Sequence, residues 1–212
     1  METSLRERKK QRTREQIADA AMNLFLERGF DAVTVAEVAR AADVAEKTVY
    51  NYFPTKEDLV YDRLEAFEDA LLEAVESRSP DDSFADAFVR FLLSSSGMLG
   101  GAEAQRARMG AVSAMIIASP SLLAREHQVF ARYTASLARL LARETAARPQ
   151  DLRPWVVANA LIGVHRALIE YVRRETIAGK TAVAVSRGVR ARAKAVLELL
   201  SDGLRDYGRA RA

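Results

Sequence analysis

Apolar residues recur three or four positions apart along most of the chain, and this spacing predicts a protein built from amphipathic α-helices. The 212 residues include only 10 glycines and 5 prolines, so few residues oppose helix formation. No run of alternating β-branched residues bounded by turns is present, which argues against a mostly β fold. We therefore predict an all-α fold of about nine helices with no internal repeat.

The N-terminal part of the chain begins with two predicted helices whose ends are well marked. An apolar stripe predicts the first helix over about residues 13–28, and Gly29 is a suitable stop after it. The second helix is predicted over residues 35–42. Thr34 precedes it and Glu37 stands three residues after Thr34, which is the spacing of a capping box.

A tight turn over residues 43–45 leads into a short third helix, predicted over residues 46–53. Pro54 ends that helix, because the residue before a proline is biased away from helical geometry. Thr55 is a candidate cap for a long fourth helix, which we expect to continue without interruption to Ser79.

The third helix carries more aromatic and hydrogen-bonding side chains than a short helix can bury. Val49 and Phe53 are four residues apart and predict the buried face. The remaining side chains are left on the flanks or outside: Lys47, Thr48, Tyr50, Asn51 and Tyr52. Such residues suit the reading of a DNA groove. Packing against the first helix is the alternative for the two tyrosines. Glu46 either accepts a hydrogen bond from a cytosine amino group or caps the third helix.

Basic residues gather at the N-terminus, although the net charge of the whole chain is only +3. The cluster consists of Arg6, Arg8, Lys9, Lys10, Arg12 and Arg14, and it is opposed only by Glu2, Glu7 and Glu15. A basic arm beside a reading helix fits phosphate binding. The alternative is a solvated tail without a partner.

The remainder of the chain, residues 81–212, predicts a second helical body. Its last two helices, over about residues 155–177 and 183–205, are apolar around much of their circumference. Two copies of this pair would form a two-fold symmetric four-helix interface, so we predict a homodimer through them. The alternative is that both helices are central in the monomer.

Composition excludes several classes of protein. The chain has no cysteine and only two histidines, His127 and His165, so disulfides, thiolate metal sites and multi-histidine metal sites are not expected. No apolar run is long enough for a membrane span, and the charged N-terminus is unlike a secretory signal, so we expect a cytoplasmic protein. No nucleotide-binding or nucleophile motif of an enzyme is present, and we expect neither catalysis nor a cofactor. The alternative to a DNA-binding function is a purely structural helical interaction module.

Within about residues 10–60, the pattern resembles the N-terminal DNA-binding domain of the tetracycline-repressor (TetR) family of bacterial regulators. The residues that carry the resemblance are Phe25, Gly29, Phe30, Thr34, Val35, Val38, Ala39, Val44, Thr48, Val49, Tyr50, Asn51, Tyr52, Phe53, Lys56, Glu57 and Leu59. The remainder is similar only in architecture. The resemblance implies three parts: a DNA-binding domain with its arm over residues 1–56, a connecting helix over 57–80, and an effector-binding and dimerisation domain over 81–212.

The resemblance also implies roles for single residues. Phosphates would be held by Thr34, Tyr52 and Lys56, and the major groove would be faced by Lys47, Thr48, Tyr50 and Asn51. The sequence departs from the common family pattern at Asp43, Ala45 and Lys47. Asp tolerates the left-handed geometry of the turn, and Asp43 is a candidate to cap the third helix in place of Ala45.

A regulator of this family implies a ligand-responsive repressor that binds palindromic double-stranded DNA as a dimer and is released by a small apolar or aromatic effector. An activator, or a regulator without an effector, is the alternative. Aromatic and methionine side chains suit an adaptable cavity. The candidate lining is Phe88, Phe91, Met109, Met115, His127, Phe130, Trp155, Asn159 and His165. Ordinary packing in the core is the alternative for each of them.

Overall fold

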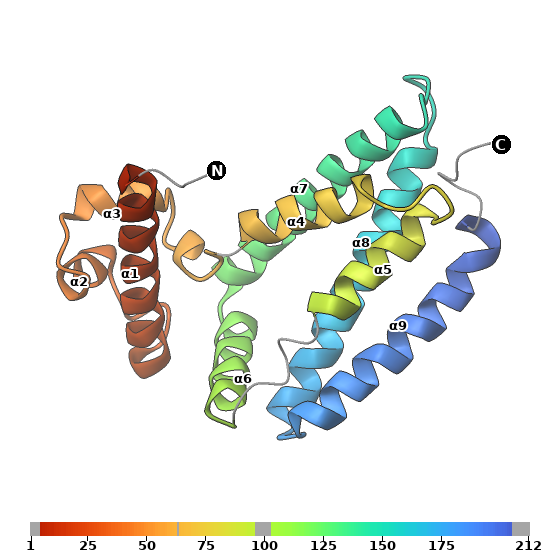
Figure 1. Ribbon diagram of the computed structural model, residues 1–212. Helices are drawn as coiled ribbons and strands as arrows, with labels where there is room; N and C mark the ends of the chain where they lie inside the picture. Colours follow the sequence, from red (N-terminus) through yellow and green to blue (C-terminus); the bar gives the residue numbers. More distant parts are fainter. Residues whose placement is uncertain (1–4, 63, 96–102, 205–212) are drawn as a thin grey trace. The chain divides into compact units, whose positions relative to one another are not determined.

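The computed structural model describes residues 5–62, 64–95 and 103–204, and all regular secondary structure in this part of the chain is helical (Figure 1). Nine α-helices and one short 3-10 helix follow one another there, which confirms the predicted all-α class. Their bounds are α1 (Leu5–Arg28), α2 (Val35–Ala41), α3 (Glu46–Tyr52), the 3-10 helix η1 (Glu57–Leu59), α4 (Leu64–Glu76), α5 (Phe84–Ser95), α6 (Glu103–Ala118), α7 (Pro120–Glu144), α8 (Arg153–Ile177) and α9 (Ala182–Leu204). None of these helices combines the length and apolar character that crossing a membrane requires.

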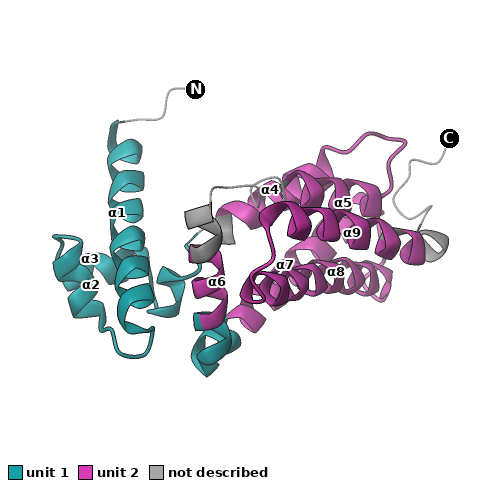
Figure 2. Ribbon diagram, turned by 90° about the horizontal axis from the view of Figure 1, so that it is seen from below, with its two compact units in different colours: residues 1–65, 115–125 teal, residues 66–114, 126–212 magenta. Residues whose placement is uncertain are grey.

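The chain folds into two compact units (Figure 2). The first unit comprises residues 1–65 together with residues 115–125, and the second comprises residues 66–114 and 126–212. The end of α6 and the start of α7 therefore belong to the same unit as α1, α2 and α3. The division into residues 1–56, 57–80 and 81–212 stays a prediction.

In the first unit, the ends of α1 and α2 are fixed by the residues that the sequence indicated. Gly29 stops α1 at a φ of 86°, and its N–H donates to the carbonyl of Phe25 over 2.9 Å. The capping box of α2 is complete: the Glu37 N–H donates to Thr34 Oγ1 over 3.2 Å, and the Thr34 N–H donates to Glu37 Oε2 over 2.8 Å. The helices meet over a buried core of Ile17, Ala21, Phe25, Phe30, Val38, Val49 and Phe53.

Helix α1 begins at Leu5, about two turns before the predicted start near residue 13. The basic residues of the N-terminal cluster are good helix formers, so the apolar stripe underestimated the length of this helix. Gln11 also donates to Glu15 over 2.8 Å, one helical turn away. The predicted arm is therefore helical from Leu5 onward.

The predicted continuous fourth helix is wrong, because the chain forms η1 and then a turn before α4 begins at Leu64. Tertiary contacts hold the intervening residues out of helical register. Arg14 of α1 pairs with Asp62 over 2.6 Å, and Tyr61 donates its hydroxyl to the carbonyl of Leu122 over 3.0 Å. Thr55 does act as a cap, but for η1: the Asp58 N–H donates to Thr55 Oγ1 over 3.3 Å.

In the second unit, α8 packs along α9, and α5 covers α9 from another side (Figures 1 and 2). The α8–α9 contact is close because Gly188 has no side chain. A Cβ placed there would lie 1.8 Å from the hydroxyl of Tyr171, which is buried. An ion pair joins α7 to α8: Arg173 donates to Glu126 over 2.9 Å, and both side chains are nearly buried.

We predict that Gly188→Ala lowers the melting temperature, because the new methyl group must displace the buried Tyr171 ring. The expected loss is about 1–3 kcal/mol of unfolding free energy, as for other overpacked cores. Thermal or urea unfolding followed by circular dichroism measures it. Gly110→Ala in α6 is the matched control, because its Cβ would meet Thr176 only at an ordinary 3.4 Å, and it should leave stability unchanged or slightly raised. Equal losses in both variants would contradict the role of Tyr171.

Candidate nucleic-acid interface and effector pocket

Helix α3 is anchored by one face and presents the other. Val49 is 1% exposed and Phe53, which follows the helix, is equally buried. Tyr50 is 47% exposed, and Lys47 and Asn51 are exposed beside it. The hydroxyl, amide and ammonium groups that can bond base edges or phosphates are therefore available on the outer face.

The remaining predicted DNA-binding residues lie at the edges of this face. Thr48 and Tyr52 are partly buried, while Thr34 is exposed at the start of α2. Thr34 Oγ1 already accepts the Glu37 N–H and donates to Glu37 Oε2 over 2.8 Å. The hydrogen bonds from Thr34 hold the pKa of Glu37 down, at about 2, with Arg28 adding to the effect. The DNA contacts of these residues stay predictions.

Lys56 lies over the aromatic pair at the end of α1. Its Nζ is 4.3 Å from the centre of the Phe30 ring and 5.8 Å from that of Phe25. Partial burial lowers the pKa of this ammonium group, and the carboxylates of Asp31, Glu57 and Glu37 oppose that shift. Cation–π contact and packing of its aliphatic stem hold the charge in a defined place next to α3.

The turn between α2 and α3 has one predicted feature and lacks another. Asp43 adopts a φ of 51°, as expected for an Asp in place of the usual glycine. Ala45 is the N-cap residue of α3, and no side chain makes a capping hydrogen bond there. The expected capping role of Asp43 is therefore wrong. The turn instead closes through its backbone, where the Val44 N–H donates to the carbonyl of Ala39 over 3.0 Å.

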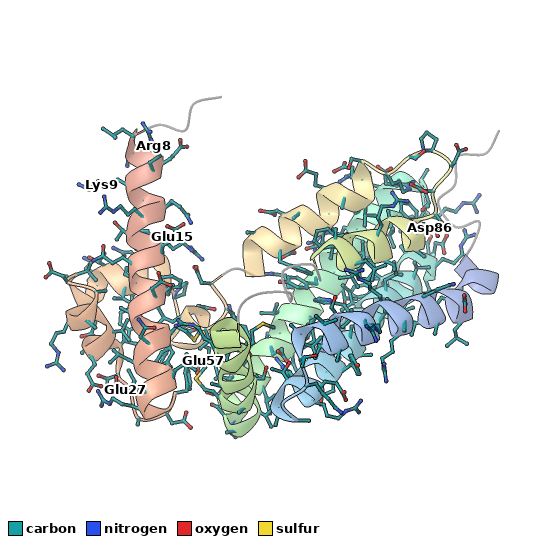
Figure 3. The ribbon with its side chains drawn as sticks, turned by 60° about the horizontal axis from the view of Figure 1, so that its bottom comes forward. Arg8, Lys9, Glu15, Glu27, Glu57 and Asp86 are labelled. Atoms are coloured by element: carbon teal, nitrogen blue, oxygen red, sulfur yellow. The ribbon has the colours of Figure 1, made fainter. Side chains whose placement is uncertain are left out.

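Arg14 differs from the other members of the basic cluster, because it holds the end of α3. Its guanidinium lies 4.8 Å from the centre of the Phe53 ring and donates to the carbonyl of Tyr52 over 3.5 Å, in addition to pairing with Asp62. Arg6, Arg8, Lys9, Lys10 and Arg12 are exposed on the first turns of α1. Figures 2 and 3 show that these turns stand clear of α2 and α3, with Arg8 and Lys9 projecting from them.

Three polar contacts connect residues 5–62, which we call the DNA-binding segment because they contain the predicted DNA-binding residues, to residues 115–125, within the first unit. Arg125 pairs with Asp58 over 2.6 Å, and Tyr61 bonds the carbonyl of Leu122. Ser119 Oγ donates to Asp31 Oδ1 over 3.4 Å. Sequence reasoning missed these contacts, because each joins residues more than sixty positions apart.

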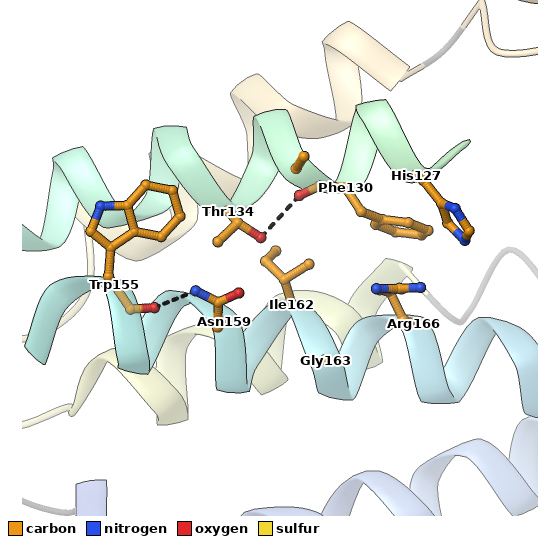
Figure 4. A pocket seen from close by; sticks show the side chains of 9 residues that line it. His127, Phe130, Thr134, Trp155, Asn159, Ile162, Gly163 and Arg166 are labelled. Atoms are coloured by element: carbon orange, nitrogen blue, oxygen red, sulfur yellow. Dashed lines mark hydrogen bonds between the residues drawn. The ribbon is translucent and has the colours of Figure 1, made fainter. Parts of the chain in front are cut away.

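A pocket of about 280 Å³ lies between α7 and α8 in the second unit (Figure 4). It is lined by His127, Phe130, Ala131, Thr134, Trp155, Asn159, Ile162, Gly163 and Arg166. Four of the predicted ligand residues thus come together: His127, Phe130, Trp155 and Asn159. Arg166 was missed, although it stands seven residues after Asn159 and therefore on the same helical face.

The other predicted ligand residues lie elsewhere. Phe88 is buried in the core, and the ring of Phe91 lies 5.2 Å from that of Phe67. His165 stacks on Phe67 at 4.9 Å and meets Phe130 edge-on at 5.8 Å. Met109 is partly buried on α6, and Met115 belongs to the first unit. A ligand role for these five residues stays a prediction that the pocket does not support.

Comparison with known proteins gives concordant matches. Residues 17–61 match the family described as bacterial regulatory proteins, tetR family. The HTH-type transcriptional regulator TcmR of Streptomyces glaucescens is 32% identical over 178 residues, which cover 81% of this chain and 76% of TcmR. A TetR-family regulator from Streptomyces coelicolor has a similar structure with a TM-score of 0.52 and 27% identity, over 89% of this chain and 96% of that one.

A more distant structural neighbour is FadR of Thermus thermophilus, a TetR-family transcriptional repressor in complex with lauroyl-CoA. It is 21% identical with a TM-score of 0.52, over 87% of this chain and 93% of that one. At this identity the likeness shows the fold alone.

The helical fold with its anchored, outward-facing α3 defines a helix-turn-helix transcriptional regulator. The chain belongs to the TetR family of bacterial regulatory proteins. The resemblance drawn from residues 10–60 is therefore confirmed, and the family is one of regulators and not of enzymes.

We predict that His165 makes the second unit sensitive to acid. Burial against the rings of Phe67 and Phe130 lowers its pKa from 6.5 to about 4. Between these values the unfolded chain binds more protons than the folded one, so stability is full above pH 6.5 and is lost as the pH falls toward 4. The loss is at most about 3 kcal/mol.

Urea unfolding at several pH values measures this effect in wild type and in His165→Gln, which cannot titrate at that position. The wild type should lose more stability than the variant between neutral pH and the lower pKa. Parallel curves for the two proteins would show that His165 is not the titrating group.

Proposed function

We propose that this chain is a ligand-responsive repressor that binds a palindromic operator as a homodimer. The observation that carries the proposal is the outer face of α3, where Tyr50 is 47% exposed beside Lys47 and Asn51 while Val49 anchors the opposite face. Large aromatic and amide side chains left in water on a rigid helix suit contacts with base edges. The exposed basic turns of α1 supply charge for phosphates.

The outer faces of α8 and α9 support a dimer. Val156 on α8 is 63% exposed, and Leu199 on α9 is 79% exposed. Small exposed side chains lie on the same two helices, including Ala167 on α8 and Ala191 on α9, and these would let a second pair of helices approach closely. A two-fold axis through this surface would present two copies of α3 to inverted half-sites.

Regulation by a small molecule is supported by the path of α7. Arg125, near the start of α7, pairs with Asp58, near the end of the DNA-binding segment. His127 and Phe130, further along α7, line the pocket. A ligand that favours one position of α7 can therefore change the DNA-binding segment by differential affinity for two states. Among the structural relatives, FadR of Thermus thermophilus holds lauroyl-CoA. An activator, or a regulator without an effector, is the alternative.

Lys56 tests the phosphate contacts. We predict that Lys56→Met weakens binding to all double-stranded DNA sequences alike and reduces the slope of log affinity against log salt by about one. Methionine keeps the stem that packs near Phe30 and removes only the charge. Fluorescence anisotropy of labelled DNA at several salt concentrations measures both quantities.

The matched control is Lys180→Met, an exposed lysine between α8 and α9. It changes the net charge of the chain equally and should leave the salt slope at its wild-type value. If Lys56→Met and Lys180→Met behave alike, Lys56 does not contact phosphate.

Asn51 tests base reading. We predict that Asn51→Ala reduces affinity for the preferred sequence by about tenfold or more, while binding to unrelated DNA and the salt slope stay unchanged. The preferred sequence is obtained beforehand from a random pool, and anisotropy titrations compare it with scrambled DNA. A uniform loss on both DNAs would assign Asn51 to the backbone, and no loss would remove it from the interface.

A further inference from the structure

The pocket between α7 and α8 has two chemically different ends (Figure 4). Trp155 stands at one end, and Arg166 of α8 and His127 of α7 stand at the other, with Asn159 and Ile162 between them. One end thus offers an aromatic surface, and the other offers N–H donors and a positive charge. A ligand that fills this space must be apolar at one end and acceptor-rich at the other.

Arg166 determines the charge of the polar end. Its guanidinium lies 5.4 Å from the centre of the Phe130 ring, and within the described residues it forms no ion pair. None of the nine lining residues carries a carboxylate. An always-charged fork of donors that lies over a ring and lines a pocket whose own residues include no acid is complementary to a carboxylate that binds it through two oxygens.

The size of the pocket limits the apolar part of the ligand. A closed cavity of roughly 150 Å³ is enough for benzene, and this pocket, which is open to solvent along the exposed residues Trp155, Asn159 and Arg166, has a volume of about 280 Å³. One aromatic ring, a short linker and a carboxylate therefore fit. The half-exposed indole of Trp155 offers the face on which such a ring can stack, and Ile162 adds apolar contact.

We propose that the pocket binds a small aryl carboxylate, with its carboxylate on Arg166 beside His127 and its ring against Trp155. Asn159 contributes to orientation: its side-chain N–H donates to the carbonyl of Trp155 over 2.8 Å, which holds the amide inside the pocket. The inference names the class of effector, so its regulatory meaning rests on the proposed repressor function. Binding itself does not rest on that function and can be measured separately.

Trp155 is the single tryptophan of the chain, so its fluorescence reports events in this pocket directly. The probe is 4-phenylbutyrate, and 4-phenylbutyramide is the uncharged control of the same shape. Both absorb too far in the ultraviolet to disturb indole emission excited at its red edge. We expect saturable changes in emission with the carboxylate and at least about tenfold weaker binding of the amide, as for loss of a charged hydrogen bond.

Arg166→Gln should weaken binding of the carboxylate by at least about tenfold and leave binding of the amide unchanged. The matched control is Arg174→Gln, an exposed arginine on the same helix but outside the pocket, and it should bind both probes like wild type. Thermal unfolding and sedimentation of both variants check that fold and oligomeric state are retained. Equal affinity for carboxylate and amide, no effect of Arg166→Gln, or no saturable binding to wild type would each overturn the proposal.

DNA binding by the same preparations separates this inference from the proposed function. If the full chain binds no specific DNA but still prefers the carboxylate through Arg166, the repressor proposal fails and the pocket assignment stands. If DNA binding is specific while the carboxylate and the amide bind alike, the pocket assignment fails alone.

Discussion

The burial of Val49 and Phe53 is the constraint on which the DNA-binding segment depends. A helix of seven residues is too short to be stable in water by its own hydrogen bonds, so α3 depends on the burial of one face, and α2 is its main helical neighbour. That packing fixes the rotation of the helix and leaves Tyr50 and Asn51 outside. Arg14 strengthens the same anchor by lying over Phe53 while it pairs with Asp62.

Helix α7 is likewise held by buried contacts at one place and presents a defined surface at another. The nearly buried pair of Glu126 and Arg173 ties α7 to α8, and the pocket lies along the same two helices. One residue earlier, Arg125 already belongs to the first unit and pairs there with Asp58. In the regulation that we propose, the ligand between α7 and α8 contacts a helix whose first turns also carry Arg125 and its ion pair with Asp58.

Local signals in the sequence predicted local structure well. The capping box of Thr34 and Glu37, the stop at Gly29 and the two faces of α3 all depend on residues within a few positions of one another. The interruption before α4 could not be predicted, because it depends on Arg14 and Leu122, which are distant in the chain. In the pocket, aromatic residues were predicted as ligand contacts because such side chains suit a cavity. In the sequence, Arg166 cannot be told from an ordinary solvated arginine, and only the structure places it in the pocket with His127.

Selection of bound fragments from a random pool of double-stranded DNA tests the central claim most directly, because it assumes no operator. The full wild-type chain should enrich one sequence made of two inverted half-sites, with centres one helical turn or a whole number of turns apart. Replacement of Tyr50 by alanine, which leaves the buried face of α3 intact, should change or abolish that enriched sequence. No enrichment, or an enriched sequence that the variant leaves unaltered, would contradict the assignment of α3 as the reading helix.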